Sequence, residues 1–382
     1  MPRGRARRHR SRHSFHPVLP SVSRPHRLPL LLLCFLALVS APAAACARPL
    51  AGPDATLAAY ERDAWPAALE AVSFAPGRDY LILLQVIPAK PLDLGDLDRV
   101  RDYLRRSVVD GLLPFQAKTL LGHMMVAWQC GGRRGMAGVS GERSNQGLKM
   151  MMAGGWGATP ILSVYRDGRV ETGAQLDARY GHLLKTRRTT TVAFEVAPRG
   201  CDRLRRFLAD FLTHPARPAD RYGLLPEPAR FEGAGCVSFA VAMAAAAGIW
   251  QGRQERFVRK IRVSERILGR RRSMPPGVEP FRPLKPGEDE VSVGWLELTL
   301  GSWTDGPAAA EVRIVDPELV YAALVEMRAR VGAAPGWRED RRLPPRDPDV
   351  ADAIAVAPHL LRPYAQRRFE QVQGFEVLVL ER

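Results

Sequence analysis

The chain has 382 residues, of which 46% are hydrophobic and 25% are charged, with a formal net charge of +16 at pH 7. This length fits one large domain or two modest ones. Its basic segments lack interleaved aromatic residues, which argues against a nucleic-acid partner, and the positive charge suits an anionic envelope polymer or a solvated basic surface.

Residues 1–47 have the layout of a secretory signal. Eight arginines, half of the formal net charge, precede an apolar stretch over residues 28–39 that is too short to span a bilayer. The small residues APAAACA follow it. A basic start, an apolar centre and small residues at the cleavage site are typical of exported proteins, so we expect a periplasmic or envelope-anchored bacterial protein.

Cys46 allows two interpretations. The small residues before it are similar to a bacterial lipobox, in which the cysteine is lipidated and anchors the mature protein to a membrane. However, Ala43 stands where leucine is usual, and ordinary cleavage after Ala45 or Ala47 fits equally well. The sequence leaves lipidation of Cys46 open.

The next part of the chain predicts strands and helices in alternation. Apolar or alternating runs predict strands over residues 80–88, 123–130 and 189–197. Helical spacing predicts helices over 97–109, where Asp96 can provide the cap, and over 201–214. Asp167-Gly168, between two alternating segments, predicts the turn of a β-hairpin.

The segment GAGCVSFAVAMAAAAGIW, residues 233–250, predicts a helix that runs from Val237 and ends at Gly248. This helix is apolar on nearly every side, so we expect it to be buried against a sheet. Cys236 stands at its start, where unpaired backbone N–H groups favour a thiolate.

Composition changes after this helix. We expect an α+β domain over residues 48–255, a basic and proline-rich linker over 256–290, and a second subdomain or an extension over 291–382. Within the last part, 291–300 fits a strand or an apolar helix, and Pro317 starts a helix that ends near residue 331.

Beyond residue 47 the chain has three cysteines and four histidines, the histidines being His123, His182, His214 and His359. The cysteines, Cys130, Cys201 and Cys236, can form one disulfide in three ways. If Cys130 pairs with Cys201, Cys236 is left as a free thiol. Their spacings do not match a zinc pair, and no phosphate loop or dinucleotide fingerprint occurs, so we expect no metal and no cofactor.

A histidine-bearing strand, GHMMVAW, followed about a hundred residues later by a cysteine-bearing helix, GAGCVSFAVAM, resembles the circularly permuted papain-like, or NlpC/P60-type, cysteine hydrolases. The resemblance covers roughly residues 118–250. It implies an antiparallel sheet packed on the buried cysteine-bearing helix, with a C-terminal extension.

The resemblance also implies roles for three residues. Cys236 would be the nucleophile, and His123 the general base and acid. Ser140, Glu142 and Gln146 are candidates to orient the imidazole, and we favour Glu142 because a carboxylate best stabilises an imidazolium. The implied reaction is cleavage of an amide or ester through an acyl-thioester. Envelope peptides, including peptidoglycan stems, are the default substrates, and acyl lipids are the alternative.

Two further interpretations compete with this one. A cysteine in an alanine-rich helix is often a small core residue, and a strand histidine beside methionines is often only structural. The same fold then serves an envelope protein as a non-catalytic binding or scaffolding module.

Overall fold

The computed structural model describes residues 53–62, 65–88, 91–111, 122–142, 146–185, 188–273, 275–332 and 347–382. The predicted signal and Cys46 lie outside the described residues. Leu50–Arg382 form one compact unit.

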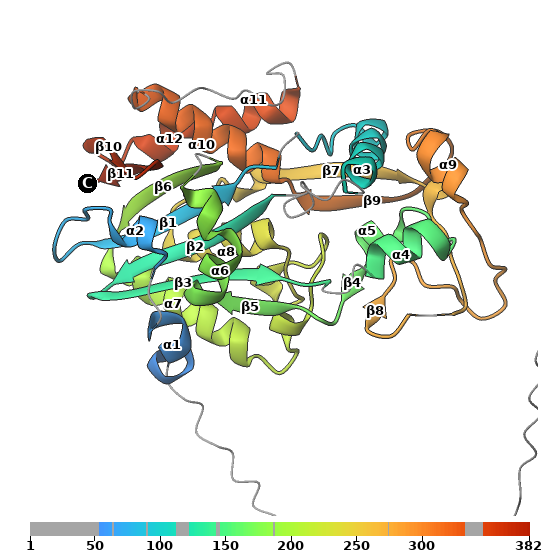
Figure 1. Ribbon diagram of the computed structural model, residues 1–382, viewed down its shortest axis with the longest axis horizontal. Coiled ribbons are helices and arrows are strands. Elements are labelled where there is room, and N and C mark those ends of the chain that lie inside the picture. The colour runs from blue at the N-terminus through green and yellow to red at the C-terminus, as the bar shows by residue number, and fades with distance from the viewer. Residues whose placement is uncertain are drawn as a thin grey trace, which may run out of the picture. The chain divides into compact units, whose positions relative to one another are not determined.

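A mixed seven-stranded sheet forms the centre of this unit (Figure 1). In spatial order its strands are β10 (Gln366–Val372), β11 (Phe375–Glu381), β6 (Thr189–Val196), β1 (Asp79–Val86), β2 (His123–Cys130), β3 (Arg133–Ser140) and β5 (Arg169–Thr172). All neighbouring strands are antiparallel except β11 and β6, which are parallel. The α+β class is therefore confirmed, whereas the sheet is not purely antiparallel as expected.

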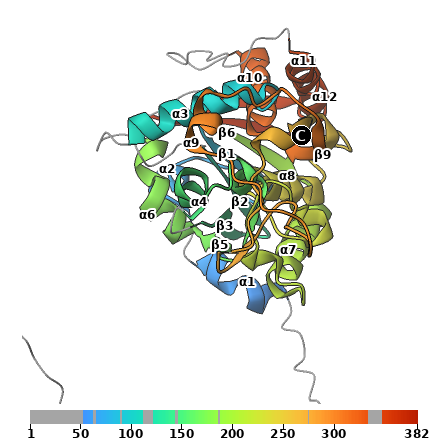
Figure 2. The ribbon, with the colours of Figure 1, turned by 90° about the vertical axis from the view of Figure 1, so that its right-hand side faces the viewer.

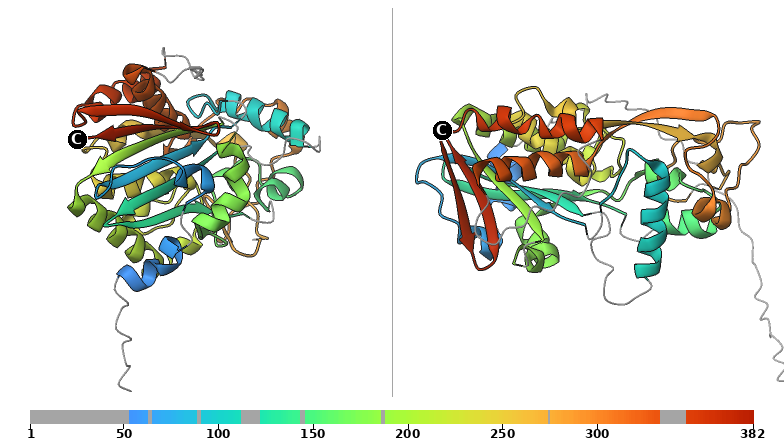
Figure 3. Two further views of the ribbon diagram at one scale, coloured as in Figure 1. Left: turned by 60° about the vertical axis from the view of Figure 1, so that its left-hand side comes forward. Right: turned by 90° about the horizontal axis from the view of Figure 1, so that it is seen from above.

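Helices cover both faces of the sheet (Figure 3). The first face carries α1 (Pro53–Arg62), α7 (Pro198–Thr213), α8 (Cys236–Ala247), α10 (Pro317–Val331), α11 (Pro348–Ile354) and α12 (Ala357–Leu361). The second face carries α2 (Ala67–Glu70) and α6 (Gly173–Leu184). We call these the α8 face and the α6 face. On β1, Leu81 and Leu83 point to the α8 face and Ile82 and Leu84 to the α6 face, which explains the continuous apolar run of this strand.

The remaining elements form one end of the unit. A second, two-stranded sheet pairs β7 (Val258–Ser264) with β9 (Ala308–Val315), and β4 (Val164–Tyr165) pairs with β8 (Val278–Glu279). The helices beside them are α3 (Leu97–Gly111), α4 (Gln146–Ala153), α5 (Thr159–Leu162) and α9 (Trp295–Leu300). The Asp96 carboxylate accepts the Asp98 and Arg99 backbone N–H groups at 3.0 and 3.3 Å, as a cap of α3 should.

The predicted linker over residues 256–290 is wrong in part, because β7 lies within it. Ile261 and Val263 of this strand are buried, while Lys260 and Arg262 point to solvent. The exposed basic side chains gave the segment its linker-like composition. Arg259 is also buried, where its guanidinium contacts the Asp316 carboxylate at 2.7 Å.

The C-terminal residues complete the main sheet. The last strand, β11, pairs with β6 through Leu378↔Val192, and β10 continues the sheet beyond it. The helices α10 to α12 pack on the α8 face in the same apolar cluster as α8. These residues therefore extend the sheet and core of the first part of the chain.

The predicted hairpin at Asp167-Gly168 is also wrong. The two segments around it pair with other strands, β4 with β8 and β5 with β3. The Asp167 carboxylate accepts the Glu142 N–H at 2.7 Å, and the Gly168 N–H donates to the Asp220 carbonyl at 3.0 Å. The polar groups of this turn form hydrogen bonds with residues that are distant in the chain. The local sequence therefore does not reveal which strands the two flanking segments pair with.

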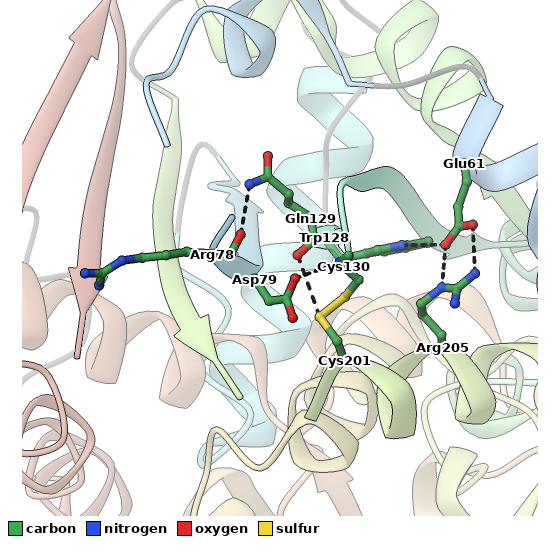
Figure 4. The surroundings of a disulfide bond; sticks show 9 residues. Glu61, Arg78, Asp79, Trp128, Gln129, Cys130, Cys201 and Arg205 are labelled. Carbon is green, nitrogen blue, oxygen red and sulfur yellow. Dashed lines mark hydrogen bonds and ion pairs between the residues drawn. A yellow bond between two sulfur atoms is a disulfide. The ribbon is translucent and has the colours of Figure 1, made fainter. Parts of the chain in front are cut away.

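A disulfide joins the end of β2 to α7 (Figure 4). Cys130 and Cys201 have Cα atoms 5.6 Å apart and lie 71 residues apart in the chain. Beside the bridge, the Glu61 carboxylate accepts the Trp128 indole N–H at 3.1 Å and an Arg205 N–H at 2.7 Å. The bridge fixes α7, and through it α8, against the sheet.

Replacing both Cys130 and Cys201 by alanine should lower the free energy of unfolding by about 2–5 kcal/mol, because the bridge closes a long loop in the unfolded chain. Guanidinium denaturation measures this change. Cys236→Ser is the matched control. A reductant should lower the denaturation midpoint of this variant by as much as it lowers that of the wild type. Equal midpoints for the double variant and the wild type would contradict the prediction.

Candidate functional site

Cys236 is the first residue of α8. The tight turn before it requires two glycines, Gly233 and Gly235. Gly233 has a φ of 131°, a conformation that favours glycine. A Cβ on Gly235 would lie 2.9 Å from the Gly223 carbonyl oxygen, so a side chain would force the turn apart. The Gly235 N–H donates to the Ser238 hydroxyl at 2.9 Å and completes the start of the helix.

Main-chain amides surround the sulfur of Cys236. The N–H groups of Met124, Val237 and Cys236 itself donate towards it, which favours the thiolate. Burial is the larger effect and raises the pKa of the thiol above its ordinary value. The thiol is therefore protonated at neutral pH. It is also the one free cysteine in the described part of the chain.

The thiol lies beside an interruption in the sheet. Strand β2 pairs with β1 from Gln129 to His123, but its pairing with β3 ends at Val126↔Ala137. Beyond that point β3 pairs with β5 on its other side. The Met124 N–H, in the stretch without a β3 partner, donates to the sulfur. We call this stretch, residues 123–125 of β2 and 138–140 of β3, the ladder gap.

His123 borders the same ladder gap from the α6 face. Its ring stacks on the Tyr180 ring with centroids 4.5 Å apart. Its Nε2 is buried without a hydrogen-bond partner and lies 3.2 Å from the point where a Cβ on Gly138 would stand. Burial, and secondarily the charge of Arg179, lowers the pKa of His123 to about 3. The imidazole is therefore neutral at physiological pH.

The structure brings Cys236 and His123 to one place, but on opposite faces of the sheet. No hydrogen bond joins their side chains in the described part of the chain. The reason is the twofold alternation of a strand: Met124 faces α8, so its neighbour His123 faces α6. The two residues are nevertheless neighbours through the backbone, since the Met124 N–H that donates towards the sulfur belongs to the residue after His123.

Glu142 does not orient the imidazole, contrary to the prediction. Its carboxylate accepts the Gly147 N–H at 2.6 Å, and its own N–H donates to Asp167. No hydrogen bond joins it to His123 among the described residues. The physical reason is that β3 ends at Ser140, and a φ of 57° at Glu142 turns the chain away from the sheet.

The other two candidates for this role differ in position. The Gln146 side chain donates to the Pro276 carbonyl at 3.2 Å, on the exposed surface. Ser140 lies on β3 next to Val139, which faces α8, so its side chain points to the α6 face as that of His123 does. Its hydroxyl is buried without a partner. Of the three, Ser140 fits the surroundings of His123 best.

Several buried polar groups on the α6 face were not predicted from the sequence. Glu171, which is 2% exposed, accepts from Arg169 at 3.1 Å and from Arg179 at 2.8 Å, and it stands opposite Gly138 in the sheet. One Glu171 oxygen and one Arg169 nitrogen remain without partners. Tyr180 could have been found, since Leu176, Tyr180 and Leu183 recur at helical spacing.

Tyr222 links the cysteine turn to the rest of the site. Its backbone exchanges hydrogen bonds with that of Tyr165 at 2.8 Å, and it bridges to Ala234. A Cβ on Gly141 would overlap its side chain. Burial, and secondarily the charge of Cys236, raises the pKa of its hydroxyl. Tyr222 thus forms part of the wall around the sulfur.

Across the described residues, no cluster of three or more histidine, cysteine or acidic side chains could hold a metal ion. Their helices include none that is both long enough and apolar enough to cross a membrane. The chain matches no protein-family model, and comparison with curated proteins and with solved structures gives no match.

The raised pKa of Cys236 predicts slow alkylation at neutral pH. Iodoacetamide should label Cys236 more slowly in the native protein than in urea at pH 7.5, because the thiolate is the reacting form. The native rate should rise with pH beyond pH 9. Mass spectrometry of the peptide that carries Cys236 measures both rates. A native rate that is already constant below pH 7 would instead indicate a thiolate–imidazolium pair.

Proposed function

We propose that this chain is an exported cysteine hydrolase of the permuted papain-like type, which cleaves an amide or ester through an acyl-thioester on Cys236. The observation that carries the proposal is the convergence of the sulfur and the His123 imidazole on one ladder gap. Envelope peptides and acyl lipids are the substrate classes that we infer.

At neutral pH both groups are uncharged, so the reaction would start from a neutral thiol and a neutral imidazole. His123 would have to become more basic than its buried pKa of about 3 when substrate binds. A neutral imidazole can accept the thiol proton as the sulfur attacks a carbonyl carbon. The resulting imidazolium then protonates the leaving group, and the imidazole later takes a proton from the water that cleaves the thioester. Gly138 carries no side chain, so His123 Nε2 and the Leu176 side chain both pack against its backbone at the ladder gap, and proton transfer to His123 would require a movement of the imidazole ring.

The backbone around the sulfur suits the charge that develops in this reaction. The N–H groups of Met124 and Cys236 point to the place where a thiolate or an adjacent oxyanion would form. They belong to a strand and a helix start, so they need little reorganisation during the reaction. The helix dipole of α8 adds to their effect.

The disulfide supports the exported location. Bridges such as Cys130–Cys201 form and persist in oxidising compartments and are rare where glutathione keeps thiols reduced. This agrees with the secretory layout of residues 1–47.

A second candidate function is a non-catalytic binding or scaffolding module of the envelope. The raised pKa of Cys236 and the positions of Cys236 and His123 on opposite faces of the sheet favour it. In this case the thiol has a structural role: it packs at the ladder gap and accepts the Met124 N–H where β3 no longer pairs with β2.

Acylation by p-nitrophenyl acetate distinguishes the two functions. The sulfur would bond to the acetyl carbon, p-nitrophenolate would leave, and the thiol proton would pass to His123. We expect an acetyl group on the Cys236 peptide of the wild type, and none in that peptide after Cys236→Ser. His123→Gln should slow acylation about 10²–10⁴-fold, the usual contribution of a general base.

His182→Gln is the matched control, because His182 is exposed on the same helix as Tyr180. Its rate should stay within about twofold of the wild type, as for most surface substitutions. Equal rates for His123→Gln and the wild type would exclude His123 as the base. A wild type that takes up no acetyl group would favour the non-catalytic module.

A further inference from the structure

The exposed large apolar side chains of the described residues gather on two helices. They are Leu148 of α4 and Trp295, Leu296 and Leu300 of α9, with exposed fractions of 44%, 37%, 70% and 68%. The two helices lie side by side at one end of the molecule (Figures 1 and 2). We call these four side chains the apolar patch. Monomeric soluble proteins rarely expose such groups together without a binding role.

The chain holds the apolar patch rigidly. An Arg101 N–H donates to the Gly301 carbonyl at 2.7 Å and closes the end of α9. The Asp98 carboxylate accepts the Trp303 N–H at 2.7 Å just beyond it. On the inner side of α9, Leu298 packs in an apolar cluster with β7 and β9. The outward side chains are thus fixed by a buried framework and do not belong to a loose loop.

The two outermost leucines share one face of α9. Leu296 and Leu300 are one helical turn apart, so they project in the same direction. Trp295 stands next to Leu296 and is less exposed. This combination of a tryptophan and leucines is typical of protein surfaces that enter the boundary between lipid headgroups and acyl chains.

The charges around the apolar patch are positive. Lys149 follows Leu148 on α4, and exposed Arg105 and Arg106 lie on α3, which packs beside α9. Most of the nearby acids are paired with arginines: Asp98 and Asp102 with Arg101, and Glu297 with Arg266 at 2.5 Å. On the segment before α9, Glu288 and Glu290 pair with Arg270 and Arg271, and only the exposed Asp289 forms no ion pair among the described residues. Among the described residues, no carboxylate forms an ion pair with Arg106 or Lys149. The net charge of this end therefore complements an anionic surface.

We propose that the apolar patch docks on an anionic lipid bilayer. Leu148, Trp295, Leu296 and Leu300 enter the interface, while Lys149 and Arg106 lie at the lipid phosphates. This surface is separate from the thiol of Cys236, and the proposal does not depend on catalysis or on a lipid at Cys46. A second copy of the chain is the competing occupant.

Co-sedimentation with vesicles tests the proposal. The chain is used from residue 48, the compact unit without the predicted signal, so that neither the apolar stretch over residues 28–39 nor a lipid on Cys46 can contribute. It should bind vesicles of phosphatidylcholine mixed with phosphatidylglycerol more tightly than phosphatidylcholine alone. Leu296→Ser with Leu300→Ser should weaken binding about tenfold or more, because apolar area leaves the membrane. Arg106→Gln with Lys149→Gln should remove most of the preference for phosphatidylglycerol.

Arg230→Gln is the matched charge control, since Arg230 is exposed beside Glu227 and Glu232. It should leave vesicle binding unchanged. Equal binding by the leucine variant and the wild type would overturn the proposal. A wild type that is dimeric in light scattering, and a leucine variant that is monomeric, would overturn it in favour of a second copy, provided that neither binds vesicles.

Discussion

The position of one backbone amide organises the candidate site. In a continuous sheet the Met124 N–H would donate to a neighbouring strand, but β3 has already left β2 at this point. A polar group buried without a partner is costly, and the Cys236 sulfur accepts the bond instead. The start of β2, the start of α8 and the departure of β3 towards β5 are thus mutually dependent. The site exists because the sheet divides here.

The division of the sheet also explains the unusual electrostatics around it. Helices cover both faces, so His123 is buried and Cys236 is partly buried, and burial shifts both pKa values towards the neutral forms. The Glu171 carboxylate on the α6 face lies between Arg169 and Arg179 and offsets part of their positive charge. Several polar atoms of this layer still lack partners, as is common where a ligand or an ordered water completes a site.

The sequence was sufficient to predict the local elements and insufficient for their pairing. Apolar periodicity predicted β2, α8 and the helix that begins at Pro317, because burial requires that periodicity. It did not predict β7, whose inward Arg259 and outward basic residues conceal the apolar alternation. The face of His123 depends on which neighbour α8 covers, and the partner of Glu142 depends on a turn with positive φ. These are tertiary facts with no signature in the local sequence.

The position of the disulfide keeps the free thiol of Cys236 away from the Cys130–Cys201 bridge. Cys130 lies at one end of β2, and Cys236 reaches Met124 near the other end. Six residues of strand separate these positions, which corresponds to about 20 Å. Attack on a disulfide requires contact between the thiolate and a bridged sulfur. Exchange within the folded chain is therefore blocked by distance, and Cys236 stays available for chemistry with external partners while the bridge persists.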